Sequence, residues 1–202
     1  MPPKGYVKSS AAKFIPREAV ELLIRAPREA GAMRDHYLFA TMFYSALRIG
    51  ECVRLKPEHL DVAHQCLMVP TLKKRKKDKA TGVKIDPLME VPIFPEAIPI
   101  YTEISEWCRG REWIFVGAKD GRHVTERTVE NIFDRWCRAL GLDEAYTPHS
   151  LRHSSCSLIA ETTKNPILVR DFARHGNVST TNVYLHRGPG RWLRAAGSLK
   201  LS

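Results

Sequence analysis

Two short β-strand patterns within an otherwise helical sequence constrain the fold most. The runs C-L-M-V-P-T-L at 66–72 and M-E-V-P-I-F at 89–94 are rich in β-forming residues, and the proline in each favours a strand at a sheet edge. One basic segment separates the two runs, so they are expected to pair as a hairpin. Because helical spacing dominates the remaining chain, we predict a mainly α fold with a small antiparallel β-sheet, in the α+β class.

Helical patterns come before and after this hairpin. A first helix is expected from Pro16 to about Pro27, and a second, from about 34 to 46, is apolar on most sides and should lie centrally in the core. An amphipathic helix should begin at Thr125 and stop at Gly141. Later apolar residues are expected to anchor the last helices in the core: Leu151, Leu158, Ile159, Ile167, Leu168 and Phe172.

The sequence is strongly basic. Its 202 residues include 32 lysines and arginines against 22 aspartates and glutamates, a net charge of +10 that suits one domain binding a polyanion. Charge alone leaves open a merely basic globular protein. A membrane-surface helix is the other alternative, but the basic run lacks the apolar face that such a helix requires. Nucleic acid is therefore the first candidate partner.

The positive charge is densest between the two strand patterns, where six of the seven positions from 73 to 79 are cationic. Such a hairpin tip is expected to be mobile in the free protein and to gain order along phosphate groups. A solvated charge run without a specific role is the alternative interpretation. The side chains expected to contact nucleic acid are Lys74, Arg75, Lys76, Lys77 and Lys79.

A dense group of histidines, with an arginine and a tyrosine, follows residue 146. Thr147 can cap a helix, and the spacing of three and four predicts His149, Arg152 and His153 on one face near its N-terminus, a favourable place for a phosphate. Further on, Tyr184 follows His175 by nine residues. An isolated H-x-x-R-H is a weak signal, because histidine pairs on helices are usually surface or core groups.

The arrangement as a whole resembles the second half of the active site of tyrosine recombinases, the phage-integrase family. The resemblance implies an earlier arginine within a leucine-arginine-x-x-glutamate motif at the end of an apolar helix, and Y-S-A-L-R-I-G-E supplies it with Arg48 and Glu51. It covers about residues 14–186 and implies the catalytic-domain fold of this family, that of the DNA breaking-rejoining enzymes.

Two short segments depart from the family pattern. Ser45-Ala46-Leu47-Arg48 stands where Thr-Gly-Leu-Arg is more frequent, and Ala173-Arg174-His175 stands where Leu-Gly-His is common. The first departure leaves the arginine in place. The second is expected to affect local packing only.

By position, the resemblance implies a role for each matched residue. The implied catalytic set is Arg48, Lys73, His149, Arg152, His175 and Tyr184, with Glu51 and His153 in supporting roles. Tyr184 would attack phosphorus, giving a 3′-phosphotyrosine and a free 5′-hydroxyl. Lys73, or else Lys74, would protonate the departing oxygen. His149 would accept the phenol proton, and His175 would hydrogen-bond a phosphoryl oxygen.

Phosphodiester chemistry at such a site needs no cofactor. Guanidinium groups bind nonbridging phosphate oxygens in pairs and stay charged at any working pH, so Arg48 and Arg152 suit a clamp that takes the place of a metal ion. The phosphotyrosine bond retains the energy of the broken linkage, and rejoining therefore needs no ATP. We expect neither a metal nor a cofactor.

The resemblance also implies a domain organisation. Residues 1–13 are expected to form a flexible N-terminal tether, 14–186 the catalytic domain, and 187–202 a tail that packs in cis or in trans. A separate DNA-clamping domain usually precedes the catalytic domain in this family, and we expect none in this sequence, which would be either a shortened recombinase or an excised fragment. The expected partner is double-stranded DNA, with self-assembly into a dimer or tetramer on it and no role for a membrane. The expected location is the cytoplasm, at the nucleoid.

Two other functions remain open. A type IB topoisomerase uses similar chemistry to relax supercoils, and a noncatalytic DNA-binding regulator of a mobile element could keep the same fold. The tyrosine nine residues after a histidine and the complete set of motif residues favour a site-specific recombinase or integrase.

The cysteines and remaining histidines predict no disulfide framework and no metal site. Five cysteines, an odd number without a C-x-x-C pair, indicate reduced and mostly buried thiols. His59, His64 and Cys66 lie close together, but the absence of a matching second pair argues against zinc. No stretch approaches the roughly 18 apolar residues that a membrane span requires.

Overall fold

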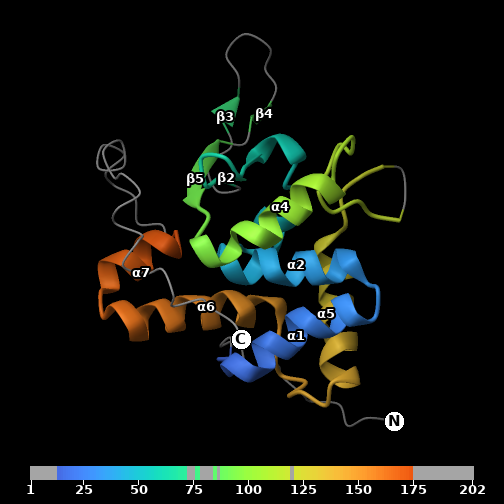
Figure 1. The fold of residues 1–202 in the computed structure, drawn as a ribbon, viewed down its shortest axis with the longest axis vertical. Coiled ribbons are helices and arrows are strands. Elements are labelled where there is room, and N and C mark those ends of the chain that lie inside the picture. Colours follow the sequence, from blue (N-terminus) through green and yellow to red (C-terminus); the bar gives the residue numbers. More distant parts are fainter. Residues whose placement is uncertain (1–12, 72–75, 78–83, 86, 119–120, 175–202) are drawn as a thin grey trace.

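Figure 1 presents the computed structural model, in which a small sheet lies at one end of a helical body. The structure describes residues 13–71, 76–77, 84–85, 87–118 and 121–174. The α-helices are α1 (Arg17–Glu29), α2 (Met33–Tyr44), α3 (Ile49–Val53), α4 (Ile98–Trp107), α5 (Glu126–Ala139), α6 (Pro148–Thr163) and α7 (Pro166–Phe172). The strands are β1 (Leu60–Asp61), β2 (Cys66–Pro70), β3 (Lys76–Lys77), β4 (Lys84–Ile85) and β5 (Leu88–Pro92), and short 3-10 helices span Pro57–His59 and Pro95–Ala97. The predicted mainly α fold with a small antiparallel sheet is confirmed.

Helix α2 occupies the centre of the helical body, as the sequence predicts. It packs against α1, α4 and α6 (Figure 1). Every residue from Asp35 to Tyr44 is buried, because apolar side chains occupy most sides of the helix. Phe39 of α2 meets Phe133 of α5 edge to face, with ring centroids 5.4 Å apart. The loop at 45–48, which follows α2, therefore starts from a firmly packed element.

The main sheet has the strand order β1-β2-β5, with both neighbouring pairs antiparallel. The predicted hairpin is confirmed, since β2 and β5 pair from Cys66 with Pro92 to Pro70 with Leu88. The prediction that both strands lie at an edge is wrong for β2, which is the central strand. Pro70 is tolerated there because β1 reaches only as far as Leu67, so Pro70 lies where β2 has a single neighbour.

Part of the basic segment between β2 and β5 forms a second sheet of two strands. β3 pairs antiparallel with β4, Lys76 with Ile85 and Lys77 with Lys84. At the base of the segment, the backbone N–H and the hydroxyl of Thr71 both donate to the Pro87 carbonyl at 2.8 Å. The hairpin thus continues into a segment for which the sequence predicts only a loop, because antiparallel pairing can extend past the packed sheet.

Helix α7 begins at a side-chain cap and buries one side. The Asn165 Oδ1 accepts hydrogen bonds from the backbone N–H groups of Ile167 and Leu168, at 3.1 and 3.2 Å. Leu168 and Phe172 are buried, whereas Ile167 is exposed. The prediction of Ile167 as a core anchor is wrong, because a helix this short turns one side to the core and Leu168 and Phe172 occupy it.

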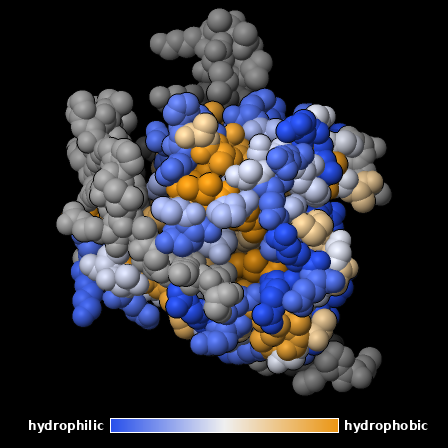
Figure 2. Space-filling model, in the orientation of Figure 1, coloured by the Kyte–Doolittle hydropathy of each residue, from blue (hydrophilic) through white to orange (hydrophobic). Residues whose placement is uncertain are grey.

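Large apolar side chains are mostly withdrawn from the surface. Figure 2 shows hydrophobic patches between hydrophilic residues on the face seen in Figure 1. The large hydrophobic residues exposed in the described ranges are Phe14, Leu88 and Ile167. All five cysteines are free and three of them are buried, which confirms the prediction of reduced thiols. Within the same ranges, no helix combines the length and the apolar character needed to cross a bilayer.

Candidate active site

The loop after α2 carries the first predicted site residues. Arg48 precedes α3, and its backbone N–H donates to the Glu51 Oε2 at 2.9 Å. The Arg48 Nη1 donates to the other carboxylate oxygen at 2.8 Å. The Glu51 side chain is buried, whereas the Arg48 side chain is 30% exposed. The predicted pair is therefore brought together, and its guanidinium lies between the core and the surface.

Arg152 reaches the same loop from α6. It is only 2% exposed, and its Nη1 and Nη2 donate to the carbonyl oxygens of Ala46 and Ala173. Ala46 has a φ of 44°, in the left-handed region. Arg152 lies 106 residues beyond Ala46 in sequence. Both arginines of the motif thus converge on one loop.

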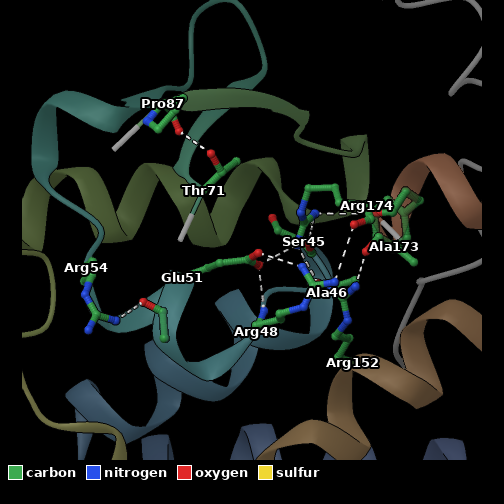
Figure 3. A network of polar contacts seen from close by, with 12 residues as sticks. Ser45, Ala46, Arg48, Glu51, Arg54, Thr71, Pro87, Arg152, Ala173 and Arg174 are labelled. Carbon is green, nitrogen blue, oxygen red and sulfur yellow. Dashed lines mark hydrogen bonds and ion pairs between the residues drawn. The ribbon is translucent and has the colours of Figure 1, made fainter. Parts of the chain in front are cut away.

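A third arginine, Arg174, belongs to the same cluster (Figure 3). Its Nη2 donates to the Glu51 Oε2 at 3.1 Å and to the Ala46 carbonyl at 2.7 Å. Its Nη1 donates to the carbonyls of Ser45 and Phe172, at 3.0 and 3.1 Å. The prediction that the exchange at 174 affects local packing only is wrong, because the turn after α7 directs this side chain into the site. The available signal was an arginine in place of a common glycine, directly before the motif histidine.

Burial and charge oppose each other within the cluster. Burial acts to raise the pKa of Glu51, but the charge of Arg174 and the hydrogen bonds and charge of Arg48 outweigh it and lower the pKa. Burial, then the charges of Arg174 and Arg48, lower the pKa of the Arg152 guanidinium. Burial likewise lowers the pKa of Arg174, against the effect of Glu51. Among the described residues, the Glu51 carboxylate pairs with Arg48 and Arg174 and lies near the charge of Arg152, so these three guanidinium groups and one carboxylate leave a surplus of two positive charges.

The two histidines of the first helical motif lie on the outer side of α6. His149 and His153 are exposed, whereas Arg152 between them is buried. The Nδ1 of His153 lies 3.5 Å from the hydroxyl of Ser157, one turn along the same helix. The three positions fall within about 100° of the helix circumference, with Arg152 toward the core and the two histidines toward solvent.

Several predicted site residues lie outside the described ranges. These are Lys73, Lys74, Arg75, Lys79, His175 and Tyr184. For Lys76 and Lys77 the structure gives the backbone pairing within β3. The roles of all these residues stay predictions from the motif.

The histidines considered for zinc have other partners. The His59 Nδ1 accepts the backbone N–H of Lys56 at 3.1 Å, and the His64 Nδ1 lies 2.8 Å from the Asp61 Oδ2. Across the residues that the structure describes, no group of three or more histidine, cysteine, aspartate or glutamate side chains is placed to hold a metal ion. His59 and His64 therefore contribute to the turns on either side of β1.

The surplus charge determines what the arginine cluster can bind. Planar guanidinium donors match the oxygens of a phosphate group, and a phosphodiester brings the negative charge that the cluster lacks. A buried excess of positive charge is unfavourable until an anion compensates it. The partial exposure of Arg48 gives the cluster a side that solvent can reach. The geometry is that of an anion site suited to phosphate.

Solved structures define the class of the fold. The fold is that of tyrosine recombinase catalytic domains. The chain is similar to XerA recombinase, with a TM-score of 0.68 and 18% sequence identity over 90% of this chain and 63% of that one. It is equally similar in fold to the Tn1549 transposon integrase in complex with circular intermediate DNA, with a TM-score of 0.68 and 17% identity over 93% of this chain and 65% of that one.

The sequence comparisons give the family. The model of the phage integrase family matches residues 13–190, and the chain belongs to this family. It is 25% identical to the tyrosine recombinase XerC of Proteus mirabilis over 197 residues, covering 92% of this chain and 59% of the relative. It is 29% identical to XerC of Halalkalibacterium halodurans over 198 residues, covering 91% of this chain and 60% of the relative. The chain thus spans about 60% of the length of these relatives.

Proposed function

We propose that this chain is the catalytic part of a tyrosine site-specific recombinase or integrase, which cleaves and rejoins DNA through a 3′-phosphotyrosine intermediate. One observation carries the proposal: Arg48 and Arg152, far apart in sequence, converge on one loop around Glu51. Family membership supports it, as do relatives named tyrosine recombinases.

In this proposal the arginines bind the scissile phosphate. A phosphodiester carries one negative charge, and its oxygens gain further charge as the transition state forms. A cluster with two surplus positive charges compensates that transition state better than it compensates the ground state. Arg48 and Arg152 would donate to the nonbridging oxygens once these replace the backbone carbonyls as acceptors.

The nucleophile and the proton carriers follow from the motif. The phenolic oxygen of Tyr184 would form a bond to phosphorus while the bond from phosphorus to the 5′ oxygen breaks. His149 would accept the phenol proton, His175 would donate to a phosphoryl oxygen, and Lys73 or Lys74 would deliver a proton to the departing oxygen. Rejoining reverses these steps, so neither a metal nor ATP takes part.

The proposal includes the partners and the domain organisation. Double-stranded DNA is the substrate, and lysines and arginines of the basic segment follow its phosphates. A catalytic domain at 14–186 acts with a tether at 1–13 and a tail at 187–202, and copies assemble on DNA as a dimer or tetramer. The Tn1549 integrase, which shares the fold, has been solved in complex with DNA, which supports this choice of partner. Such a protein works at the nucleoid in the cytoplasm.

A nicked suicide duplex, from which the cleaved end diffuses away, tests the proposal. The wild-type chain should form a covalent protein–DNA adduct in the presence of EDTA, and Tyr184→Phe should bind DNA equally well without forming it. Tyr146→Phe is the matched control, because it removes the hydroxyl of another tyrosine near the motif. An adduct that persists in Tyr184→Phe, or that requires magnesium, contradicts the mechanism. Specific DNA binding by a wild type that forms no adduct favours the noncatalytic regulator.

A further inference from the structure

Arg174 occupies a backbone conformation that disfavours its own residue type. Its φ is 49°, in the left-handed region, where any residue with a Cβ is disfavoured by about 1 kcal/mol relative to glycine. The residue directly precedes the motif histidine at 175, at a position where related sequences commonly have glycine. A strained conformation that the surrounding contacts hold in place is typical of a functional site. The contacts of this side chain therefore indicate what it does.

The donors of Arg174 are almost fully used within the protein. A guanidinium has five N–H groups, and four of those of Arg174 point to Ser45, Ala46, Phe172 and Glu51. The fifth, on Nε, is buried and has no hydrogen-bond partner among the residues that the structure describes. With its side chain only 3% exposed, Arg174 has no donor free to reach a substrate phosphate. It acts through its neighbours.

Two of the groups that accept hydrogen bonds from Arg174 also accept from one of the two clamp arginines, Arg48 or Arg152. The Glu51 Oε2 accepts from both the Arg48 backbone and Arg174, while the Oε1 accepts from the Arg48 guanidinium. The Ala46 carbonyl accepts from both Arg152 and Arg174. The backbone carbonyl of Arg174 is itself 3.4 Å from the Arg48 Nη2. Arg174 thus connects the two halves of the clamp.

Besides connecting the two clamp arginines, Arg174 adds a positive charge to the cluster. Without Arg174, the Glu51 carboxylate would face Arg48 and Arg152 alone, and the surplus would fall from two positive charges to one. The nearby thiol does not change this balance, because burial raises the pKa of Cys156 and keeps it neutral. Arg174 shares the carboxylate and so leaves more of the Arg48 charge available to an anion.

We propose that Arg174 is a positioning residue of the phosphate clamp: it fixes the Glu51 carboxylate and the Ala46 carbonyl so that Arg48 and Arg152 meet at one phosphate, and its charge keeps the cluster cationic. This inference rests on the proposed function, since the clamp is defined by the reaction. Because the added charge matters most when the phosphate is most negative, Arg174 contributes more to the cleavage step than to DNA binding.

The test compares Arg174→Gly, which removes the guanidinium and suits the backbone conformation, with Arg174→Lys and with Arg170→Met. Arg170 is a matched control, because it is an exposed arginine near the end of α7, the helix that precedes Arg174. Arg174→Gly should cleave the suicide duplex about 10- to 100-fold more slowly at saturating DNA, with the Kd for DNA changed less than about threefold. Millimolar guanidinium chloride should restore much of the rate, and the same concentration of sodium chloride should not.

Arg174→Lys keeps the charge but has only three donors on one nitrogen, so its rate should fall between those of Arg174→Gly and the wild type. Arg170→Met should match the wild type. The inference is overturned by wild-type cleavage in either Arg174 variant, by a rate loss that only follows weaker DNA binding, or by a folded Arg174→Gly that guanidinium does not rescue. Should Arg174→Gly fail to fold, the rate of Arg174→Lys decides alone.

A second readout separates this inference from the proposed function. Inorganic phosphate should raise the Tm of the free wild-type protein, and the shift should shrink in both Arg174 variants but not in Arg170→Met. If the wild type forms no DNA adduct while the phosphate effect still depends on Arg174, the recombinase proposal fails and the clamp stands. If the adduct forms and the phosphate effect is the same in all variants, the positioning role is wrong.

Discussion

Two ion-pair clusters in this protein, each built on a buried carboxylate, differ in how deeply their arginines are buried. The first surrounds Asp35 near the start of α2. Its carboxylate accepts from the Arg135 Nη2 at 3.1 Å and from the Trp136 Nε1 at 3.0 Å, and the Arg34 Nη2 lies 3.5 Å away. The carboxylate is buried, but the Arg135 side chain is 67% exposed. Arg135 therefore keeps much of its hydration, and Arg34 is 36% exposed.

The second cluster, around Glu51, buries cations as well as an anion. Arg152 and Arg174 are both withdrawn from solvent, and Arg48 alone among the three arginines is partly exposed. Water screens the charges around Asp35, so that cluster can join α2 to α5 without a further ligand. The charges around Glu51 lack this screening, and their surplus becomes favourable only with an anion present. The first cluster is structural, and we infer that the second is kept for binding.

The turns beside the two clusters differ in their backbone strain. Gly31, which leads into α2 and Asp35, has a φ of 73° at a residue suited to it. Ala46 and Arg174 have φ values of 44° and 49°. Both residues carry a Cβ, which disfavours this left-handed conformation. Backbone strain thus accompanies the arginine cluster and is absent from the glycine turn before Asp35.

The largest expected effect is on the rate of DNA cleavage, which should depend on the Glu51 cluster and not on the Asp35 cluster. Arg152→Lys keeps the charge but loses the paired donors, and cleavage should fall by about 10³-fold, at the upper end for loss of one transition-state donor. Arg135→Lys, the matched change in the Asp35 cluster, should cleave at the wild-type rate. Single-turnover cleavage of the suicide duplex measures both. Equal losses in the two variants would mean that the clusters do not differ in function.

A smaller effect is expected in stability. Glu51→Gln leaves three guanidinium groups without their carboxylate and should lower the free energy of unfolding by about 3 kcal/mol. Asp35→Asn should cost less, about 1 to 2 kcal/mol, because Arg135, its nearer arginine partner, is largely exposed to water. Urea denaturation at neutral pH compares the two variants. A larger loss in Asp35→Asn would reverse the proposed contrast.

The same carboxylate gives the stability of the wild type a pH dependence. Because the folded protein lowers the pKa of Glu51 below its ordinary value of 4.5, its stabilisation is complete above that value and is lost as the pH falls through the lowered pKa. The difference in unfolding free energy between the wild type and Glu51→Gln should therefore shrink in acid. A difference that stays constant down to pH values well below the ordinary one would show that the Glu51 charge contributes nothing.

The smallest expected effect concerns the turns. Ala46→Gly should raise the free energy of unfolding by about 0.5 to 1 kcal/mol, since it relieves a left-handed alanine. Gly31→Ala should lower it by a similar amount, because it creates the same strain in a turn where no neighbouring atom opposes the new Cβ. Thermal unfolding of both variants measures the opposite signs. A destabilised Ala46→Gly would show that the Ala46 methyl packs more favourably than its backbone is strained.

Much of the fold follows from periodicity. The apolar helix at 34–46 and the amphipathic one from Thr125 were predicted because a spacing of 3.6 residues marks a buried side whatever the tertiary partners are. β1 could not be predicted, because a two-residue strand has no period of its own and depends on its pairing with Leu67 and Cys66. For the same reason, the central place of β2 became visible only in the assembled sheet.

The site was predicted in part, for a related reason. The family motif indicates that Arg48 and Glu51 belong to one site, because it places them three residues apart, and the structure shows them paired at the start of α3. Spacing cannot indicate that Arg174 folds back onto Glu51, a contact across 123 residues that depends on the turn after α7. Nor does spacing alone separate Arg152 from His149 and His153, since burial of one side of α6 is set by the helices packed against it.

A substrate with an altered phosphate tests the central claim, that the buried arginine surplus serves a phosphate charge. In a methylphosphonate linkage a neutral methyl group replaces one nonbridging oxygen, so the scissile group carries no negative charge for Arg152 to compensate. On ordinary DNA, Arg152→Ala should cleave far more slowly than the wild type, and on the neutral linkage the gap should close by about 10²-fold. An equally slow Arg152→Ala on both substrates would contradict a role for this cluster in binding phosphate charge.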